Sequence, residues 1–196
     1  MFIETFRITN GNLPDCKHHN ARLHRTRQAH FDDIVAWDLA QLVSVPAHAR
    51  EGVWKGRLSY TKNVEKIEFE PYRPRLIQSL RLVQCDAVDY NFKFQNRQII
   101  NDLYAQRGSD DDVLIVKNGC VTDASYANVV FWDGTRWLTP DTPLLEGTQR
   151  ARLLEDRQIQ TTRIQPSDLA KFSYARLINA MLVFEDTPLI PIANIF

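Results

Sequence analysis

The stretch from Cys120 to Arg150, CVTDASYANVVFWDGTRWLTPDTPLLEGTQR, decides the fold of this 196-residue chain. Its first part, Val121 to Trp132, is rich in Val, Phe and Trp and predicts a strand. Asp133-Gly134 then predicts a hairpin turn, because a type I′ turn needs positive φ at both central residues. Thr135 to Thr139 predicts the returning strand, so the stretch predicts a buried hairpin that carries one acidic residue, Asp123.

A loop and a helix follow the hairpin. Pro140, Asp141 and Pro143 predict the loop. Thr148 is the expected N-cap of a helix that runs through Glu155. Because Gly147 leads into this helix, its first backbone N–H groups are free to bind a phosphate or another anion. Taken alone, these features are also explained by a simple helix cap and by an acidic residue at a turn or strand edge.

Two upstream segments carry further chemistry. Tyr90 to Arg97, YNFKFQNR, contains the pattern K-x-x-N-R, which begins at Lys93. His19 to Leu23, HNARL, contains Arg22, whose guanidinium can bind phosphate in a bidentate way that lysine cannot. By themselves, a lone lysine near a strand end and the basic helical segment 17–27 are typical of solvated surface.

The motifs together resemble one enzyme family. T-D-A-S-Y-A-N-V-V-F, the D-G turn, T-P and L-L-x-G-T-x-R, preceded by K-x-x-N-R and H-x-x-R-L, are similar to the class IV aminotransferases, which are fold type IV pyridoxal-phosphate enzymes. This family includes D-amino-acid and branched-chain transaminases and 4-amino-4-deoxychorismate lyase. The resemblance extends over nearly the whole chain. It implies an α/β (α+β) fold of two domains with mixed sheets, and pyridoxal 5′-phosphate as the cofactor.

The resemblance also implies roles for single residues. Lys93 is expected to be the catalytic lysine, which holds the cofactor and then acts as a base at the substrate Cα. Asp123 stands where most members have Glu and is expected to pair with the pyridine nitrogen. The expected cofactor-binding residues are Arg22, Lys93, Asp123, Asn128, Gly147, Thr148 and Gln149. The expected substrate-binding residues are Thr5, Asn179 and Ala180. No metal is expected, since no residues stand at metal-ligand spacing.

The choice of reaction stays open. Phe2 to Ile8 resembles the family's F-E-T-I-R-V strand, and from this resemblance the chain is expected to be a short form that lacks the two strands preceding it in the family. The K-x-x-N-R pattern and Thr5 favour the lyase, which splits aminodeoxychorismate into aminobenzoate and pyruvate. The alternatives are amino-acid transamination, cofactor binding without turnover, and a plain α/β binding module with accidental motifs.

Composition narrows the class of protein. The 24 basic and 24 acidic residues give zero net charge, which argues against a general binder of nucleic acid or anionic membranes. An odd number of cysteines, three, favours reduced thiols and a cytoplasmic enzyme. The chain shows neither a signal peptide nor an apolar run long enough for a membrane span. Because family sites include loops of a neighbouring subunit, a homodimer is expected.

Periodicity places the remaining elements. Two domains are expected, a small α/β domain at 1–86 and a larger cofactor-binding domain at 87–196. Helices are expected at 17–27, 31–42 and 96–107, and strands at 2–8, 52–61, 66–72, 77–88, 89–95, 112–117, 158–164, 176–183 and 189–192. Within 89–95, Tyr90, Phe92 and Phe94 alternate with polar residues, so Lys93 is expected to point away from the aromatic face.

Overall fold

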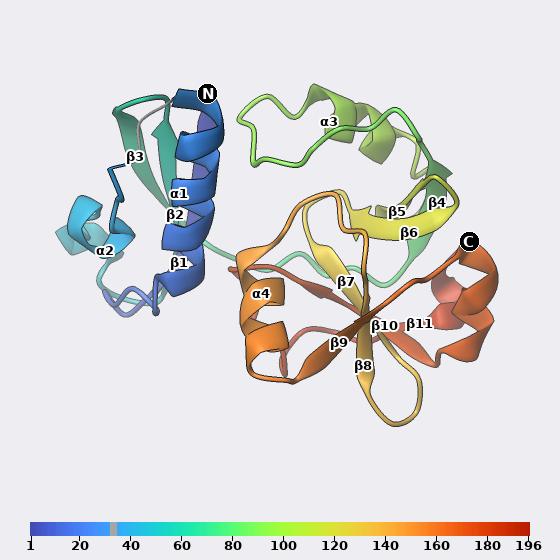
Figure 1. Ribbon diagram of the computed structural model, residues 1–196. Coiled ribbons are helices and arrows are strands. Elements are labelled where there is room, and N and C mark those ends of the chain that lie inside the picture. Colours follow the sequence, from blue (N-terminus) through green and yellow to red (C-terminus); the bar gives the residue numbers. More distant parts are fainter. Residues whose placement is uncertain (32–34) are drawn as a thin grey trace. The chain divides into compact units, whose positions relative to one another are not determined.

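The computed structural model describes residues 1–31 and 35–196 and divides them into two compact units (Figure 1). Unit 1 consists of Met1–Pro74 and Phe92–Asn96, and unit 2 of Arg75–Asn91 and Arg97–Phe196. The expected domains, 1–86 and 87–196, differ from these units at two segments, 75–86 and 92–96. Residues 75–86 go with unit 2 because they contain strand β4 (Leu80–Gln84), which pairs with a strand of that unit.

Unit 1 is built on an antiparallel sheet with the strand order β1-β2-β3. The strands are β1 (Phe2–Thr9), β2 (Val53–Tyr60) and β3 (Val64–Pro71), and the helices are α1 (Lys17–Phe31), α2 (Leu39–Leu42) and the 3₁₀ turn η1 (Ala47–Ala49). Helix α1 covers one face of the sheet (Figure 1). Alternation along β1 turns Phe2, Glu4 and Phe6 to the interior, where all three are buried. The core includes Leu23 of α1.

The predicted helix 31–42 is wrong over residues 35–38, which are not helical, and residues 32–34 lie outside the described residues. The chain re-enters a helix only at Leu39, where Asp38 is the N-cap and accepts a hydrogen bond from the Ala40 N–H. Asn20 of α1 holds this junction: its Nδ2 donates to Asp38 Oδ1 at 3.0 Å, and its Oδ1 accepts from the Leu39 N–H at 2.9 Å. Polar contacts with α1 thus replace a continuous helix.

The predicted strand 89–95 is also wrong. Among the described residues this segment forms only an isolated bridge between Phe2 and Phe94. The chain turns tightly at Lys93, where the Phe94 N–H donates to the Phe92 carbonyl at 2.9 Å. Tyr90 belongs to unit 2 and Phe92–Asn96 to unit 1, so the alternation does not mark one face of a sheet.

Unit 2 contains an eight-stranded mixed sheet with the order β11-β10-β7-β6-β5-β4, in which β8 pairs with β7 and β9 with β8. Its strands besides β4 are β5 (Asp112–Lys117), β6 (Cys120–Ala124), β7 (Asn128–Trp132), β8 (Trp137–Pro140), β9 (Ile159–Thr162), β10 (Tyr174–Ile178) and β11 (Ile190–Pro191). Its helices are α3 (Gln98–Ala105) and α4 (Thr148–Glu155), with 3₁₀ turns η2 (Pro166–Lys171) and η3 (Ile192–Asn194). Parallel pairs β4–β5 and β8–β9 lie among antiparallel ones, which confirms the mixed α/β class.

The single strand expected at 121–132 is in fact two strands, β6 and β7, which pair in antiparallel fashion. The short turn 125–127 joins them and places Asp123 opposite Asn128. The next hairpin, between β7 and β8, is confirmed, but its turn spans 133–136, and only Gly134 has a positive φ, 99°. The Asp133 side chain stabilises this turn by accepting hydrogen bonds from the Thr135 and Arg136 N–H groups.

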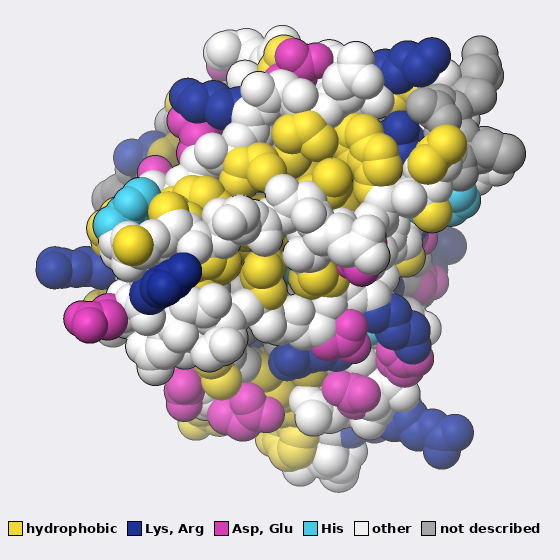
Figure 2. All heavy atoms as spheres, turned by 90° about the vertical axis from the view of Figure 1, so that its left-hand side faces the viewer, with side chains coloured by type: hydrophobic (Ala, Val, Ile, Leu, Met, Phe, Trp, Pro, Cys, Tyr) yellow, Lys and Arg dark blue, Asp and Glu magenta, His cyan; other side chains and the backbone are white. Residues whose placement is uncertain are grey.

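Charged side chains are distributed over the surface without a patch of one sign on the face drawn in Figure 2, where acidic and basic residues are interspersed. This distribution agrees with the zero net charge of the chain. In the part of the chain that the structure describes, no helix is both long enough and apolar enough to cross a membrane.

Candidate active site

In unit 2, several of the predicted site residues lie around Asp123. Its carboxylate is buried, with 6% of the residue exposed. Asn128 Nδ2 donates to Asp123 Oδ1 at 2.7 Å, and the Leu145 N–H donates to Oδ2 at 2.9 Å. Burial raises the pKa of Asp123 to about 6, although these hydrogen bonds and the charge of Arg150 act in the opposite direction. Both direct donors are neutral, so the buried carboxylate has no cation in hydrogen-bond contact within the described residues.

The start of helix α4 lies beside this carboxylate. Gly147 is the N-cap and Thr148 the first helical residue, so the expected cap at Thr148 is wrong by one position. A glycine is required here, because a Cβ at Gly147 would lie 1.9 Å from Asn128 Oδ1. Asn128 Nδ2 also donates to the Leu145 carbonyl at 2.8 Å, so this one side chain links Asp123, residue 145 and the helix start.

The first turn of α4 has unused donors. Its N-cap makes no side-chain hydrogen bond, and the first intrahelical bond runs from the Ala151 N–H to the Gly147 carbonyl. The N–H groups of the preceding residues therefore lack helical partners. Thr148 and Gln149 are buried, and Gln149 Nε2 has no hydrogen-bond partner in the described chain. Such an arrangement of buried donors suits an anion.

Arg150 is a residue that the sequence analysis missed. It is buried in α4, where its Nη2 donates to the Pro140 carbonyl at 2.9 Å and its Nε has no partner among the described residues. Burial lowers the pKa of Arg150, while the charges of Asp123, Glu146 and Asp141 oppose this effect. The signal was present, since Arg150 closes the L-L-x-G-T-x-R motif.

Arg22 of unit 1 is buried and bound to a second missed residue, Glu4. Arg22 Nε donates to Glu4 Oε2 at 3.1 Å, and Arg22 Nη2 donates to Glu4 Oε1 at 2.5 Å. This pair of hydrogen bonds does not involve Arg22 Nη1. His19 Nδ1 lies 2.6 Å from the same Oε1. Burial alone would raise the pKa of Glu4, but the charge of Arg22 and the hydrogen bonds from His19 and Arg22 lower it to about 2.

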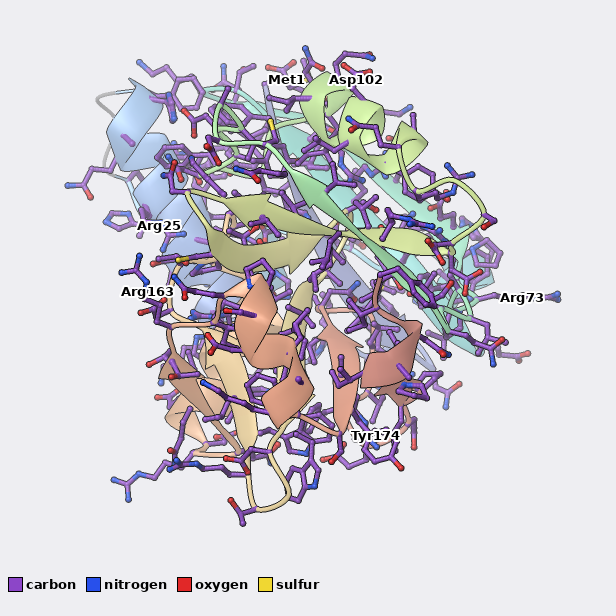
Figure 3. The ribbon with its side chains drawn as sticks, turned by 90° about the vertical axis from the view of Figure 1, so that its right-hand side faces the viewer. Met1, Arg25, Arg73, Asp102, Arg163 and Tyr174 are labelled. Carbon is purple, nitrogen blue, oxygen red and sulfur yellow. The ribbon has the colours of Figure 1, made fainter. Side chains whose placement is uncertain are left out.

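The other basic residues of α1 differ in burial. Lys17 and Arg25 are exposed, as expected of a solvated helix face. Arg27 is an exception: it is buried, with its guanidinium 3.7 Å from the centre of the Trp37 ring. Outside the motifs, Arg73 is exposed and points away from the molecule (Figure 3). Arg22 is therefore distinguished from its neighbours by burial together with a bidentate carboxylate contact.

The remaining predicted residues are placed as follows. Lys93 is half-buried in unit 1, where its carbonyl accepts a hydrogen bond from the Ile3 N–H at 2.9 Å. Thr5 is half-buried on β1 of the same unit. The strand expected at 176–183 ends at Ile178, so Asn179 and Ala180 follow β10 in unit 2, and Asn179 Oδ1 accepts from the Met181 N–H at 2.8 Å.

The structure thus assembles two groups. Within unit 2 it brings together Asp123, Asn128, Gly147 and the residues that open α4. Unit 1 carries Thr5, Arg22 and Lys93.

This chain is similar to known proteins over most of its length. A model of the family Amino-transferase class IV matches residues 1–195. An uncharacterised protein of Haemophilus influenzae is 35% identical over 180 residues, which cover 91% of this chain and 96% of the relative.

Solved structures show the same similarity. A protein of Haemophilus somnus 129PT, provisionally described as a 4-amino-4-deoxychorismate lyase, is 34% identical with a TM-score of 0.85, and the match covers 92% of this chain and 95% of that one. The pyridoxal-phosphate-bound form of a hypothetical aminotransferase of Mycobacterium tuberculosis is 18% identical with a TM-score of 0.76 and coverages of 96% and 79%, which shows a shared fold alone.

Proposed function

Because the chain belongs to the class IV aminotransferase family, we propose that it is a pyridoxal-phosphate-dependent enzyme that acts on an amino-acid-type substrate, with the 4-amino-4-deoxychorismate lyase reaction favoured. The observation that carries the proposal is the buried Asp123 carboxylate, whose direct partners are both neutral. The similarity to the Haemophilus somnus protein and the K-x-x-N-R pattern of the sequence support the lyase.

The residues present fit the cofactor. A buried carboxylate without a cation in contact is costly, and a protonated ring nitrogen would compensate its charge. The buried donors at the start of α4 suit a phosphate group. When bound, pyridoxal phosphate supplies an electron sink for the chemistry at the substrate Cα.

Each residue then has a defined task. Lys93 would hold the cofactor through its Nζ and later take a proton from the substrate Cα. Asp123 would keep the ring nitrogen protonated, and Asn128 would fix the Asp123 carboxylate in place through its 2.7 Å hydrogen bond. Arg22, the Thr148 hydroxyl and the N–H groups of Thr148 and Gln149 would bind the phosphate. Thr5, Asn179 and Ala180 would face the substrate.

Amino-acid transamination is the second candidate. The description of the family itself favours it, and so does the fold shared with a protein of Mesorhizobium loti that is provisionally described as an amino-acid aminotransferase, which is 24% identical with a TM-score of 0.79. The two reactions differ in where the proton goes after it leaves Cα. Elimination of the enolpyruvyl group releases pyruvate and leaves 4-aminobenzoate, whereas transfer of the amino group needs a keto acid as acceptor.

Product analysis tests the proposal. The purified protein, loaded with pyridoxal phosphate, is incubated with aminodeoxychorismate and separately with a panel of amino and keto acids. Equal amounts of 4-aminobenzoate and pyruvate are the expected result, and a strict need for a keto acid would instead establish the transaminase. Lys93→Ala should abolish turnover, while Lys117→Ala, the matched control in β5, should retain it. A coloured, cofactor-loaded protein without any turnover would refute the enzymatic proposal.

We propose in addition that the active form is a cytoplasmic homodimer. Class IV enzymes build their sites with loops from a neighbouring subunit, and two-fold pairing is the commonest assembly of soluble chains. Light scattering of the loaded protein at micromolar concentration is the measurement. A monomer that turns over substrate would refute the dimer.

A further inference from the structure

The segment that carries Lys93 is held in an unusual way. Phe92–Asn96 belongs to unit 1, whereas the chain on both sides of it belongs to unit 2. Strand β1 holds this segment by its backbone: the Ile3 N–H donates to the Lys93 carbonyl at 2.9 Å, and the Gln95 N–H donates to the Met1 carbonyl at 3.2 Å. The bridge between Phe2 and Phe94 lies between these two hydrogen bonds.

Contacts between aromatic side chains also hold the segment in place. The His30 ring, in the last turn of α1, lies 4.6 Å from the Phe2 ring and 4.5 Å from the Phe92 ring, which it meets edge-on at 80°. The Phe2 ring lies 5.2 Å from the Phe94 ring. These separations are in the range of favourable aromatic pairs. We call Phe2, His30, Phe92 and Phe94 the aromatic clamp.

The aromatic clamp includes both sequence neighbours of Lys93. Phe92 and Phe94 are the residues immediately before and after it, and each has its ring packed against Phe2, His30 or both. The Lys93 carbonyl is also bonded to Ile3, so the lysine backbone is tied to β1 while the side chains on both sides of it pack against β1 and α1. Groups that do chemistry must be held to a fraction of an ångström, and a small misplacement lowers the rate strongly.

We propose that the aromatic clamp positions Lys93 and that His30 is a positioning residue for this lysine. The proposal rests on the proposed role of Lys93 in catalysis. His30 is the informative member, because it is exposed and can be replaced without emptying the core, whereas Phe2 is buried at the centre of the cluster. Its ring contacts both Phe2 of β1 and Phe92 of the lysine segment, so its loss removes one link between the two.

Hydrogen exchange tests the clamp directly. In His30→Ala the amides of Ile3 and Gln95, whose hydrogen bonds join the lysine segment to the N-terminal strand region, should exchange about tenfold faster, because ring contacts that keep the segment there are lost. His30→Phe keeps an aromatic ring and should exchange as the original protein does. His24→Ala, also on α1, is the matched control. Unchanged Ile3 and Gln95 amides in His30→Ala would overturn the clamp, and Phe92→Leu tests it from the other side.

Kinetics test the positioning role. In the loaded enzyme His30→Ala should lower kcat by about tenfold or more with little change in KM, and His30→Phe should restore it. Faster exchange with an unchanged kcat would overturn positioning, since the clamp would then be packing alone. If the original protein turns over no substrate, the proposed function fails, while the exchange experiment still decides whether His30 holds the lysine segment.

Discussion

The buried carboxylate of Asp123 makes a quantitative prediction about stability and pH. Its pKa in the folded protein is about 6, compared with an ordinary value of 3.8. A raised pKa means that the folded state binds the proton more tightly than the unfolded state does, so ionisation of Asp123 destabilises the fold as pH rises through this window. The difference of about two in pKa corresponds to about 3 kcal/mol at neutral pH.

The perturbation is Asp123→Asn, which cannot titrate. The free energy of unfolding is measured by urea denaturation of the cofactor-free protein and of the variant. The value for the original protein minus that for the variant should fall by about 2 kcal/mol between about pH 4.5 and about pH 7.5, since part of the total is already lost at the lower pH. Titration of other groups cancels in this difference, and so does the fixed cost of replacing one carboxylate oxygen by an amide.

The prediction has a sharp refutation. A difference that stays constant across this pH range would show that Asp123 titrates alike in the folded and unfolded chains, and the argument from a buried carboxylate without a cation in contact would fail. Saturating pyridoxal phosphate should remove the pH dependence, because a protonated ring nitrogen would give Asp123 the cation it lacks.

Four further predictions concern the turn, the helix start and the Arg22 fork. Asp133→Asn should show the opposite sign to Asp123→Asn: hydrogen bonds from Thr135 hold the Asp133 pKa at about 2, so its contribution is present above the ordinary value of 3.8 and is lost as pH falls toward 2, in the same urea assay. Gly147→Ala should destabilise the fold by about 1–3 kcal/mol, because its Cβ collides with Asn128 Oδ1, and adding Asn128→Ala should cost less than the sum of the two single changes. Glu4→Ala should cost about 3–5 kcal/mol in thermal or urea unfolding, since it leaves Arg22 buried and unpaired, and a cost below about 1 kcal/mol would contradict this. Arg22→Ala should weaken cofactor binding by about 2–3 kcal/mol in a fluorescence titration, and an unchanged affinity would count against a phosphate contact.

Local signals predicted much of the fold and failed where distant contacts decide. Strand β5 is found at its predicted residues, 112–117, and Asn118-Gly119 forms the turn after it, with φ values of 51° and 74°. The strand and the turn both form from residues that are close together in the sequence. The predicted helix 31–42 and strand 89–95 failed because each segment is held from a distance, one by Asn20 and the other by β1.

The sequence also predicted the structure around Asp123 only in part. Val121 to Trp132 was predicted as one strand because it is rich in Val, Phe and Trp, and the turn at 125–127 contains no glycine or proline to mark it. The turn is fixed instead by a buried acid from the neighbouring strand: Asp112 Oδ1 accepts from the Ser125 N–H at 3.2 Å, and Oδ2 accepts from the Ser125 hydroxyl at 3.0 Å. No pattern within 121–132 contains that information.

Glu4 shows what the sequence could still have revealed. In F-I-E-T-F-R-I it occupies the same face as Phe2 and Phe6, so alternation along this strand could have placed a carboxylate inside the core, an inference that the sequence analysis did not draw. A buried carboxylate needs a cationic partner, and Arg22 of the H-x-x-R-L motif was the candidate already singled out. The same reasoning applied to Asp123 finds only neutral donors in contact. One buried acid is therefore satisfied within the chain and the other is not, and this difference, more than either motif alone, makes Asp123 the residue that calls for a cationic ligand.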